Sequence, residues 1–107
     1  MSDTSVNCTF CKIVKSEMSA DFEHVGEGVF AFKDIDPLAK IHLLVVPKKH
    51  IESFLEIKEE DKDLLAEMVR TVQELIERKG IGQTYRIVFN GGKYQHVPHL
   101  HWHLLGD

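Results

Sequence analysis

Histidine occupies every second position of one short segment near the C-terminus. Residues 99–105 are His-Leu-His-Trp-His-Leu-Leu. In a β-strand successive side chains point to opposite faces, so this spacing predicts His99, His101 and His103 in one row, with the apolar residues 100, 102 and 104 on the other side. An imidazole titrates near neutral pH and can act as acid, base, nucleophile or metal ligand. Buried imidazoles need polar partners, so the segment predicts a functional site rather than core filling.

The order of the rings suggests a division of roles. His101 has an imidazole neighbour on each side and is best placed to be a nucleophile. A neutral imidazole attacks through one nitrogen, while a hydrogen bond at the other nitrogen fixes the ring. The N–H of His103 can hold a phosphoryl oxygen where negative charge develops. This arrangement favours displacement at phosphorus in two steps, through a phosphohistidine-type intermediate.

Two loop residues have side chains that suit a nucleotide. Asn90 precedes Gly91 and Gly92, where the backbone can approach a ligand closely, although Asn-Gly is also a common turn. Asp34 follows an apolar segment, and its carboxylate can accept hydrogen bonds from ribose hydroxyls. A surface loop carboxylate is the other interpretation of Asp34.

Further polar residues lie near this chemistry in the sequence. His42 shares a strand face with Leu44, and it is either a hydrogen-bonded core histidine or part of the site. Gln95 and His96 come shortly before the histidine row and can reach its mouth. For His24 we expect a surface position.

A Cys-x-x-Cys motif, Cys8 and Cys11, lies near the N-terminus. A pair with this spacing is a zinc half-site, a redox dithiol or two buried thiols. The absence of a surrounding βαβ pattern disfavours the redox motif. Tetrahedral zinc needs two more ligands, and histidine is a natural completion. His50 and His99 are the candidates, although they lack the short local spacing of zinc fingers.

Hydrophobic periodicity predicts an α+β fold, with an antiparallel sheet of about five strands, one long helix and a short N-terminal helix. The long helix has apolar residues at helical spacing from Leu64 to Ile76 and ends at Gly80 and Gly82. Its start is poorly signalled, because residues 58–60 include no good N-cap. Its broad apolar stripe fits either a core helix or a dimer surface. The predicted short helix lies within residues 8–16, and the predicted strands are residues 22–25, 29–32, 41–46, 85–89 and 98–105.

Composition limits the classes of protein and partner. A chain of 107 residues predicts a single domain over residues 1–107, with residues 1–7 as a flexible N-terminus. The net charge of −4 predicts no binding to a nucleic-acid polymer. No apolar run approaches the length that spans a membrane, and the first five residues lack a secretion signal. We therefore expect a cytoplasmic protein whose cysteines are reduced.

The histidine segment fits the His-φ-His-φ-His-φ-φ signature, where φ is apolar, of the histidine triad (HIT) family. Other segments resemble the nucleotide-binding branch of that family in the expected order: Phe10-x-x-Ile13, Phe32-Lys33-Asp34-Ile35-Asp36-Pro37, the segment from His42 to Pro47-Lys48-Lys49-His50, and Arg86-Ile87-Val88-Phe89-Asn90. The resemblance covers residues 8–106.

The resemblance implies a nucleotide hydrolase or transferase that acts at the α-phosphate of purine nucleotides, such as nucleoside phosphoramidates. It implies that His101 forms a nucleotidyl intermediate, that His103 contacts the α-phosphate and that His42 supports the triad begun by His99. It implies a ribose contact by Asp34 and Ile35 and a phosphate or leaving-group contact by Asn90. A homodimer formed through the long helix and the next strand is also implied. The implied base pocket consists of Phe10, Ile13, Phe32 and Leu44.

The resemblance also implies a metal. In members that begin with Cys-x-x-Cys, the equivalents of Cys8, Cys11, His50 and His99 hold a structural zinc ion. These ligand types suit a closed tetrahedral site. We therefore expect a structural Zn²⁺ and no catalytic metal.

Two departures from the family pattern concern the leaving group. Where the family usually has a serine that helps to protonate the leaving group, this chain has His96, and an imidazole can serve as a general acid. Many members also continue past the position of Asp107 with a tail that covers the site, so we expect a more open leaving-group side. The alternatives are a nucleotide-binding regulator with vestigial activity, a dinucleoside polyphosphate hydrolase, and a metal-storage protein.

Overall fold

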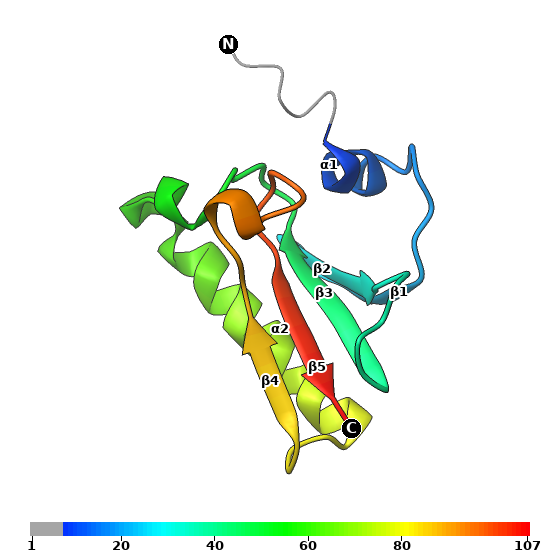
Figure 1. Ribbon diagram of the computed structural model, residues 1–107. Helices are drawn as coiled ribbons and strands as arrows, with labels where there is room; N and C mark the ends of the chain where they lie inside the picture. The colour runs from blue at the N-terminus through cyan, green and yellow to red at the C-terminus, as the bar shows by residue number, and fades with distance from the viewer. Residues whose placement is uncertain (1–7) are drawn as a thin grey trace.

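The computed structural model describes residues 8–107, so the expectation of a flexible N-terminus for residues 1–7 lies outside the described residues. The described chain forms a five-stranded antiparallel sheet in the order β1-β2-β3-β5-β4 (Figure 1). The predicted α+β architecture is confirmed. The strands are β1 (Phe22–Val25), β2 (Val29–Lys33), β3 (Ile41–Pro47), β4 (Tyr85–Val88) and β5 (Trp102–Gly106), and the helices are α1 (Thr9–Val14) and α2 (Lys62–Lys79).

The long helix α2 covers one face of the sheet (Figure 1). Its buried residues pack against the alternate residues of β2 and β3 that point to this side, and against Leu104 of β5. Burying apolar area in this way is the main favourable term in folding. The main core of the molecule therefore lies between α2 and the sheet. Its strand and helix members include Val29, Ala31, Leu43, Val45, Leu104, Met68, Val72 and Leu75.

A second, smaller apolar cluster lies on the opposite face, because the intervening residues of the same strands point there. Phe30 and Phe32 of β2 and Leu44 and Val46 of β3 pack with α1. The rings of Phe30 and Phe32 stack with centroids 5.6 Å apart, and Phe10 of α1 meets Phe32 edge-on at the same centroid distance, 5.6 Å. This cluster supports the floor of the site described below.

The histidine segment differs from the prediction at its start. Strand β5 begins at Trp102 rather than at residue 98. Pro98 has no N–H to donate, the N–H of His99 bonds to the carbonyl of Val97 at 2.8 Å, and the N–H of Leu100 bonds to the carbonyl of Ile51 at 2.6 Å. These N–H groups therefore pair with loops and not with a neighbouring strand. The alternation of faces persists, since Leu100, Trp102 and Leu104 all belong to the core beneath α2.

The start of α2 depends on an acidic residue that the sequence did not single out. Short 3₁₀ turns, Phe54–Glu56 and Glu59–Asp61, precede the helix. The buried carboxylate of Asp61 accepts hydrogen bonds from the Lys49 ammonium at 2.6 Å and from the Lys58 N–H at 2.9 Å. These two bonds hold the pKa of Asp61 below its usual value. The Lys49 bond joins the beginning of α2 to the segment that follows β3.

The end of α2 agrees with the prediction. Gly80 adopts a left-handed conformation with φ of 68°, which glycine tolerates without steric cost. The N–H groups of Gly80 and Ile81 cap the last carbonyls of the helix. Within residues 8–107, no helix combines the length and the apolar character needed to cross a membrane.

Candidate active site and metal centre

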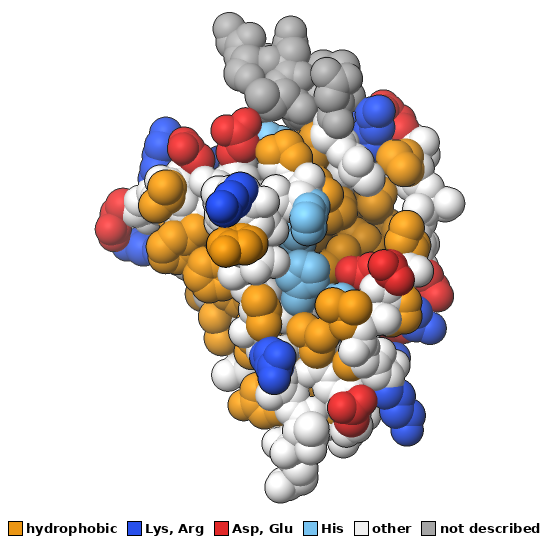
Figure 2. Space-filling view, viewed as in Figure 1, with side chains coloured by type: hydrophobic (Ala, Val, Ile, Leu, Met, Phe, Trp, Pro, Cys, Tyr) orange, Lys and Arg blue, Asp and Glu red, His pale blue; other side chains and the backbone are white. Residues whose placement is uncertain are grey.

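A pocket of about 560 Å³ opens on the face of the sheet opposite α2. Apolar side chains from α1, β2 and β3 form one wall, and the histidine segment and the residue 90–97 loop supply polar groups. Figure 2 shows histidine side chains gathered beside this apolar hollow. The structure brings together ten of the predicted site residues in its lining: Phe10, Ile13, Phe32, Asp34, Ile35, Leu44, Asn90, His96, His101 and His103.

Three of the predicted catalytic and substrate-binding residues lie outside the pocket lining. The side-chain amide of Gln95 donates to the carbonyls of Glu52 at 2.7 Å and Val97 at 2.9 Å, so it anchors the loop instead of reaching the mouth of the pocket. His42 is buried behind His103. His99 is fully buried and belongs to a separate cluster.

The hydrogen bond at Nδ1 of His101 determines its reactive nitrogen. Nδ1 lies 2.7 Å from the carbonyl oxygen of His99, and a carbonyl can only accept, so Nδ1 is the protonated nitrogen. In the neutral ring Nε2 then has the free lone pair. Burial lowers the pKa of His101, which keeps the ring neutral near pH 7. His101 thus has a nucleophilic nitrogen in a ring that Phe10 contacts edge-on, with centroids 5.1 Å apart.

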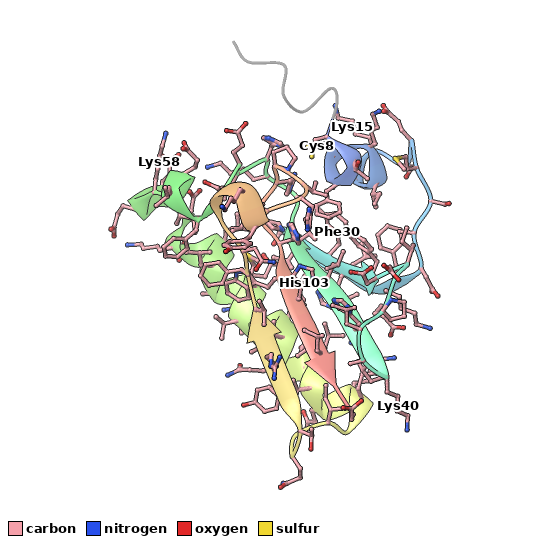
Figure 3. The ribbon with its side chains drawn as sticks, viewed as in Figure 1. Cys8, Lys15, Phe30, Lys40, Lys58 and His103 are labelled. Atoms are coloured by element: carbon pink, nitrogen blue, oxygen red, sulfur yellow. The ribbon has the colours of Figure 1, made fainter. Side chains whose placement is uncertain are left out.

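His103 has the opposite tautomer. The cause is a chain of two hydrogen bonds that starts at the backbone N–H of Leu38 and passes through His42. The N–H of Leu38 donates to Nδ1 of His42 at 3.1 Å, so neutral His42 has its proton on Nε2. That nitrogen lies 2.9 Å from Nδ1 of His103 and 3.4 Å from the carboxylate of Asp34. Nδ1 of His103 therefore accepts, and Nε2 of His103 is left as an N–H donor. In Figure 3 the labelled His103 lies near the start of β5.

Asp34, His42 and His103 place three potential metal-binding atoms within 4.8 Å of one another, but their hydrogen bonds do not suit a cation. A metal on Nε2 of His42 would move the ring proton to Nδ1. That proton would then face the N–H of Leu38, which donates to the same atom. These three residues form a hydrogen-bonded chain that sets the tautomer of His103.

A second cluster has the donor set of a metal centre: Cys8, Cys11, His50 and His99. Nδ1 of His99 lies 3.2 Å from Sγ of Cys8, 3.6 Å from Sγ of Cys11 and 3.2 Å from Nδ1 of His50. Zn–N and Zn–S bonds of about 2.0–2.3 Å give a tetrahedron with edges of roughly 3.3–3.8 Å. The donor spacing is therefore close to that of a tetrahedral site.

The protonation states of this cluster also suit a cation. Nε2 of His99 donates to the carbonyl of Pro47 at 2.8 Å, which leaves the lone pair of Nδ1 toward the cysteines. Burial lowers the pKa of His99 to about 4 and raises the pKa of Cys11 to about 11. His99 and Cys11 are thus neutral by themselves, and a divalent cation would reverse the preference of the Cys11 thiol by stabilising the thiolate. Both cysteines are free and buried.

Comparisons with known proteins place this geometry in a family. Residues 7–107 match the family model described as scavenger mRNA decapping enzyme C-term binding. Protein HitA of Neisseria gonorrhoeae is 37% identical over 102 residues, which cover 94% of this chain and 95% of that protein. The chain belongs to the histidine triad (HIT) family. The resemblance stated from the sequence is thereby confirmed.

Other HIT relatives extend the comparison to structure and to a named activity. A HIT family hydrolase from Clostridium thermocellum has a TM-score of 0.90 and 40% identity, and the match covers 94% of this chain and 90% of that one. The Arabidopsis thaliana protein named bifunctional adenosine 5′-phosphosulfate phosphorylase/adenylylsulfatase HINT4 is 34% identical over 105 residues. That match covers 96% of this chain and 72% of the relative.

Sequence reasoning missed two kinds of site residue in this HIT protein. The N–H of Leu38 orients His42, but it is a backbone group, and no side-chain pattern signals it. The segment from Met18 to Asp21 and the side chain of Val97 line the pocket. Only Val97 had a signal, since it is an apolar residue between His96 and Pro98. Residues 18–21 line the pocket because of the path that the chain takes, and their residue types give no sign of this position.

We expect the rings of His101 and His103 to have opposite tautomers in solution. At pH 6.5, where a free imidazole is about half protonated, ¹⁵N NMR should show neutral His101 protonated at Nδ1 and neutral His103 protonated at Nε2. Burial is the first cause of the lowered pKa of each ring. A spectrum with His101 protonated at Nε2 would contradict the assignment.

Proposed function

We propose that this HIT protein is a nucleotidyl hydrolase or transferase that cleaves at the α-phosphate of purine nucleoside phosphoramidates or related nucleotidyl compounds. The observation that supports it best is the pairing of tautomers. A free Nε2 lone pair on His101 lies beside a ring, His103, that offers an Nε2–H, with ring centroids 5.1 Å apart. One ring can attack phosphorus while the other stabilises the charge on its oxygens.

The remaining pocket supports a nucleotide as the substrate. The apolar side chains of Phe10, Phe32 and Leu44 offer a surface on which a purine ring can be buried. Asp34 accepts the N–H of Asp36 at 2.9 Å through one carboxylate oxygen and has capacity left for ribose hydroxyls. Ile35 is fully exposed at the mouth of the pocket, and Asn90 supplies an amide for a phosphate oxygen. We propose these roles for the ribose and phosphate contacts.

The mechanism that follows has two displacements. His101 attacks the α-phosphorus through Nε2, while its Nδ1–H remains hydrogen-bonded to the His99 carbonyl. This hydrogen bond stabilises the positive charge that the ring acquires. The bond to the leaving group breaks, and a nucleotidyl-histidine forms. Water then displaces the histidine and releases the nucleoside monophosphate. The name of the HINT4 relative describes cleavage of an adenosine 5′-phosphoryl compound, which supports a nucleotide anhydride as a second substrate type.

Replacing the nucleophile tests this function. We expect His101→Asn to lower release of AMP from adenosine 5′-phosphoramidate by about a thousandfold or more, because the covalent route is lost. Calorimetry should show that the affinity for AMP changes by less than about threefold, since the base and ribose contacts remain. Wild-type chain that binds AMP but releases none from nucleoside phosphoramidates or dinucleoside polyphosphates would indicate a regulatory nucleotide-binding protein instead.

We also propose that the cluster of two cysteines and two histidines holds a structural zinc ion. Cys8 and Cys11 belong to the α1 segment, whereas His99 adjoins the nucleophile. Bound zinc would neutralise the negative charge of two thiolates and would hold the ring of His99 in one orientation. The reduced cysteines also agree with a cytoplasmic location, which we propose for this protein.

Metal analysis of the purified chain should give one zinc ion per chain. Cys11→Ser should lose the metal and lower the melting temperature, because metal-binding energy is folding energy. Lys12→Gln, in the same helix, should retain both. Full zinc content in Cys11→Ser would refute this ligand set, and more than one ion per chain would favour the metal-storage hypothesis.

We propose a homodimer formed through α2 and β4. β4 is an edge strand of the described sheet, and Tyr85, Ile87 and Phe89 expose 51%, 44% and 43% of their surfaces. Phe54 stacks on Phe89 with ring centroids 5.0 Å apart, and Val69 of α2 is also exposed. Exposed apolar side chains on β4, on the segment after it and on α2 favour association.

Sedimentation should show a dimer that Ile87→Arg converts to monomer, since a charge would be buried without a partner. Val25→Arg is the matched control, because Val25 is an exposed apolar residue of β1 at the opposite edge of the sheet. Equal dissociation by both substitutions, or none by Ile87→Arg, would place the interface elsewhere.

A further inference from the structure

We propose that Asp34 is a positioning residue for the chemical step, in addition to its proposed contact with ribose. Its carboxylate keeps the proton of His42 on Nε2, which in turn keeps His103 a donor at its own Nε2. It also places a negative charge near the ring of His101. The inference rests on the proposed function and deepens it, because part of the rate then depends on Asp34 without any sugar hydroxyl.

The loop that follows β2 contacts His42 at three atoms. The N–H of Asp34 donates to the His42 carbonyl at 3.0 Å, and the N–H of Leu38 donates to Nδ1 at 3.1 Å. Oδ2 of Asp34 lies 3.4 Å from Nε2 of His42, whose side chain is only 2% exposed. An ionised carboxylate beside an imidazole favours the tautomer whose N–H faces it. The Leu38 amide and the Asp34 carboxylate therefore select the same tautomer of His42 from opposite ends of the ring.

Within residues 8–107, no lysine or arginine lies within ion-pair distance of Asp34. Its one partner at such a distance is His42. The neighbouring ammonium of Lys33 instead pairs with Asp21 at 3.5 Å and with Glu23 at 3.6 Å. The side chain of Asp34 is only 18% exposed, and a partly buried carboxylate without a cation is costly to keep. Its negative charge thus acts on the neighbouring imidazoles.

The two oxygens of Asp34 have different neighbours. Oδ1 accepts the N–H of Asp36 at 2.9 Å, whereas Oδ2 is the oxygen near Nε2 of His42. A carboxylate has about four lone-pair sites, so a ribose hydroxyl can bind to Asp34 without displacing His42. The contact with His42 therefore exists whether or not the pocket holds a sugar hydroxyl.

The charge of Asp34 lies close to both rings of the proposed reaction. Asp34 lines the same pocket as His101 and His103, whose ring centroids are 5.1 Å apart. Burial lowers the pKa of His103, and the charge of Asp34 opposes this lowering. His101 becomes positively charged when the lone pair of Nε2 forms the bond to phosphorus while Nδ1 keeps its proton. A fixed carboxylate near that ring stabilises the new charge without reorganisation.

The two roles of Asp34 predict different kinetics. A contact with ribose affects only substrates that have the 2′- and 3′-hydroxyls. A charge that acts on the histidines affects the rate with every nucleotidyl substrate, including one whose sugar has neither hydroxyl. A 2′,3′-dideoxy substrate therefore isolates the second role.

Adenosine 5′-phosphoramidate and its 2′,3′-dideoxy analogue provide the test. We expect Asp34→Asn to lower the first-turnover rate at saturating dideoxy substrate by about tenfold or more, because the stabilising charge is lost. The dideoxy concentration that gives half of this rate should change by less than about threefold, since no hydroxyl contact exists to be lost. Asp36→Asn is the matched control. It removes the same charge from an exposed side chain of the same loop, and it should change neither value.

The tautomer of His42 provides a readout that a contact with the sugar alone would not change. In the wild-type chain, ¹⁵N NMR should show neutral His42 protonated at Nε2. We expect Asp34→Asn to lower the fraction of this tautomer, because no carboxylate then faces that nitrogen. Asp36→Asn should retain the wild-type fraction. The same spectra show whether each variant is folded, and Asp34→Ala provides a second substitution if asparagine is not tolerated.

The remaining outcomes overturn the inference in different ways. An unchanged first-turnover rate of Asp34→Asn with the dideoxy substrate would show that the carboxylate serves the sugar alone. A slower rate with an unchanged His42 tautomer would refute the route through His42. Wild-type turnover of the ribose substrate but not of the dideoxy substrate would show that the hydroxyls are indispensable. Failure of the wild-type chain to cleave either substrate would refute the proposed function itself.

Discussion

The hydrogen bond from Nδ1 of His101 to the carbonyl oxygen of His99, 2.7 Å long, joins the proposed catalytic centre to the proposed metal centre. It sets the tautomer of His101, the proposed nucleophile, and its acceptor belongs to His99, whose side chain lies beside the cysteines. Because the bond is short and buried, it stabilises the ring more than the same bond would in water. The orientation of the His101 ring therefore depends on the position of the His99 backbone. The side chain of His99 is held in turn by contacts with Phe10, the Pro47 carbonyl and Cys8.

Backbone groups set the proton positions of His99, His101 and His42, and His42 in turn sets that of His103. The carbonyls of Pro47 and His99 accept from His99 and His101, and the amide of Leu38 donates to His42. Backbone groups cannot change between donor and acceptor, whereas a side-chain partner such as serine or another imidazole can. The triad thus has a defined set of tautomers before any ligand arrives, which is the preorganisation that electrostatic catalysis requires.

Much of the architecture was predictable because it depends on side-chain type. Alternation correctly placed Leu100, Trp102 and Leu104 on the face opposite the histidine row. The pocket-side positions of His42 and Leu44 agree with the shared face predicted for them. Prediction failed where the structure depends on hydrogen bonds to backbone carbonyls of other segments. The bond from Leu100 to the Ile51 carbonyl shortens β5, and the carbonyls of Glu52 and Val97 hold Gln95 away from the pocket. Such bonds join segments distant in sequence and leave no periodic signal.

Cys8 and His99 are neighbours in space although 91 positions separate them in the chain. Forming a contact between residues so distant in the chain is costly, because closing the long loop loses conformational entropy before the contact can stabilise the fold. Phe10, which forms one wall of the pocket, and His101, the proposed nucleophile, are likewise brought together from opposite ends of the described chain. A cation held by the cysteines and His99 would therefore fasten one wall of the pocket to the segment that contains the proposed nucleophile.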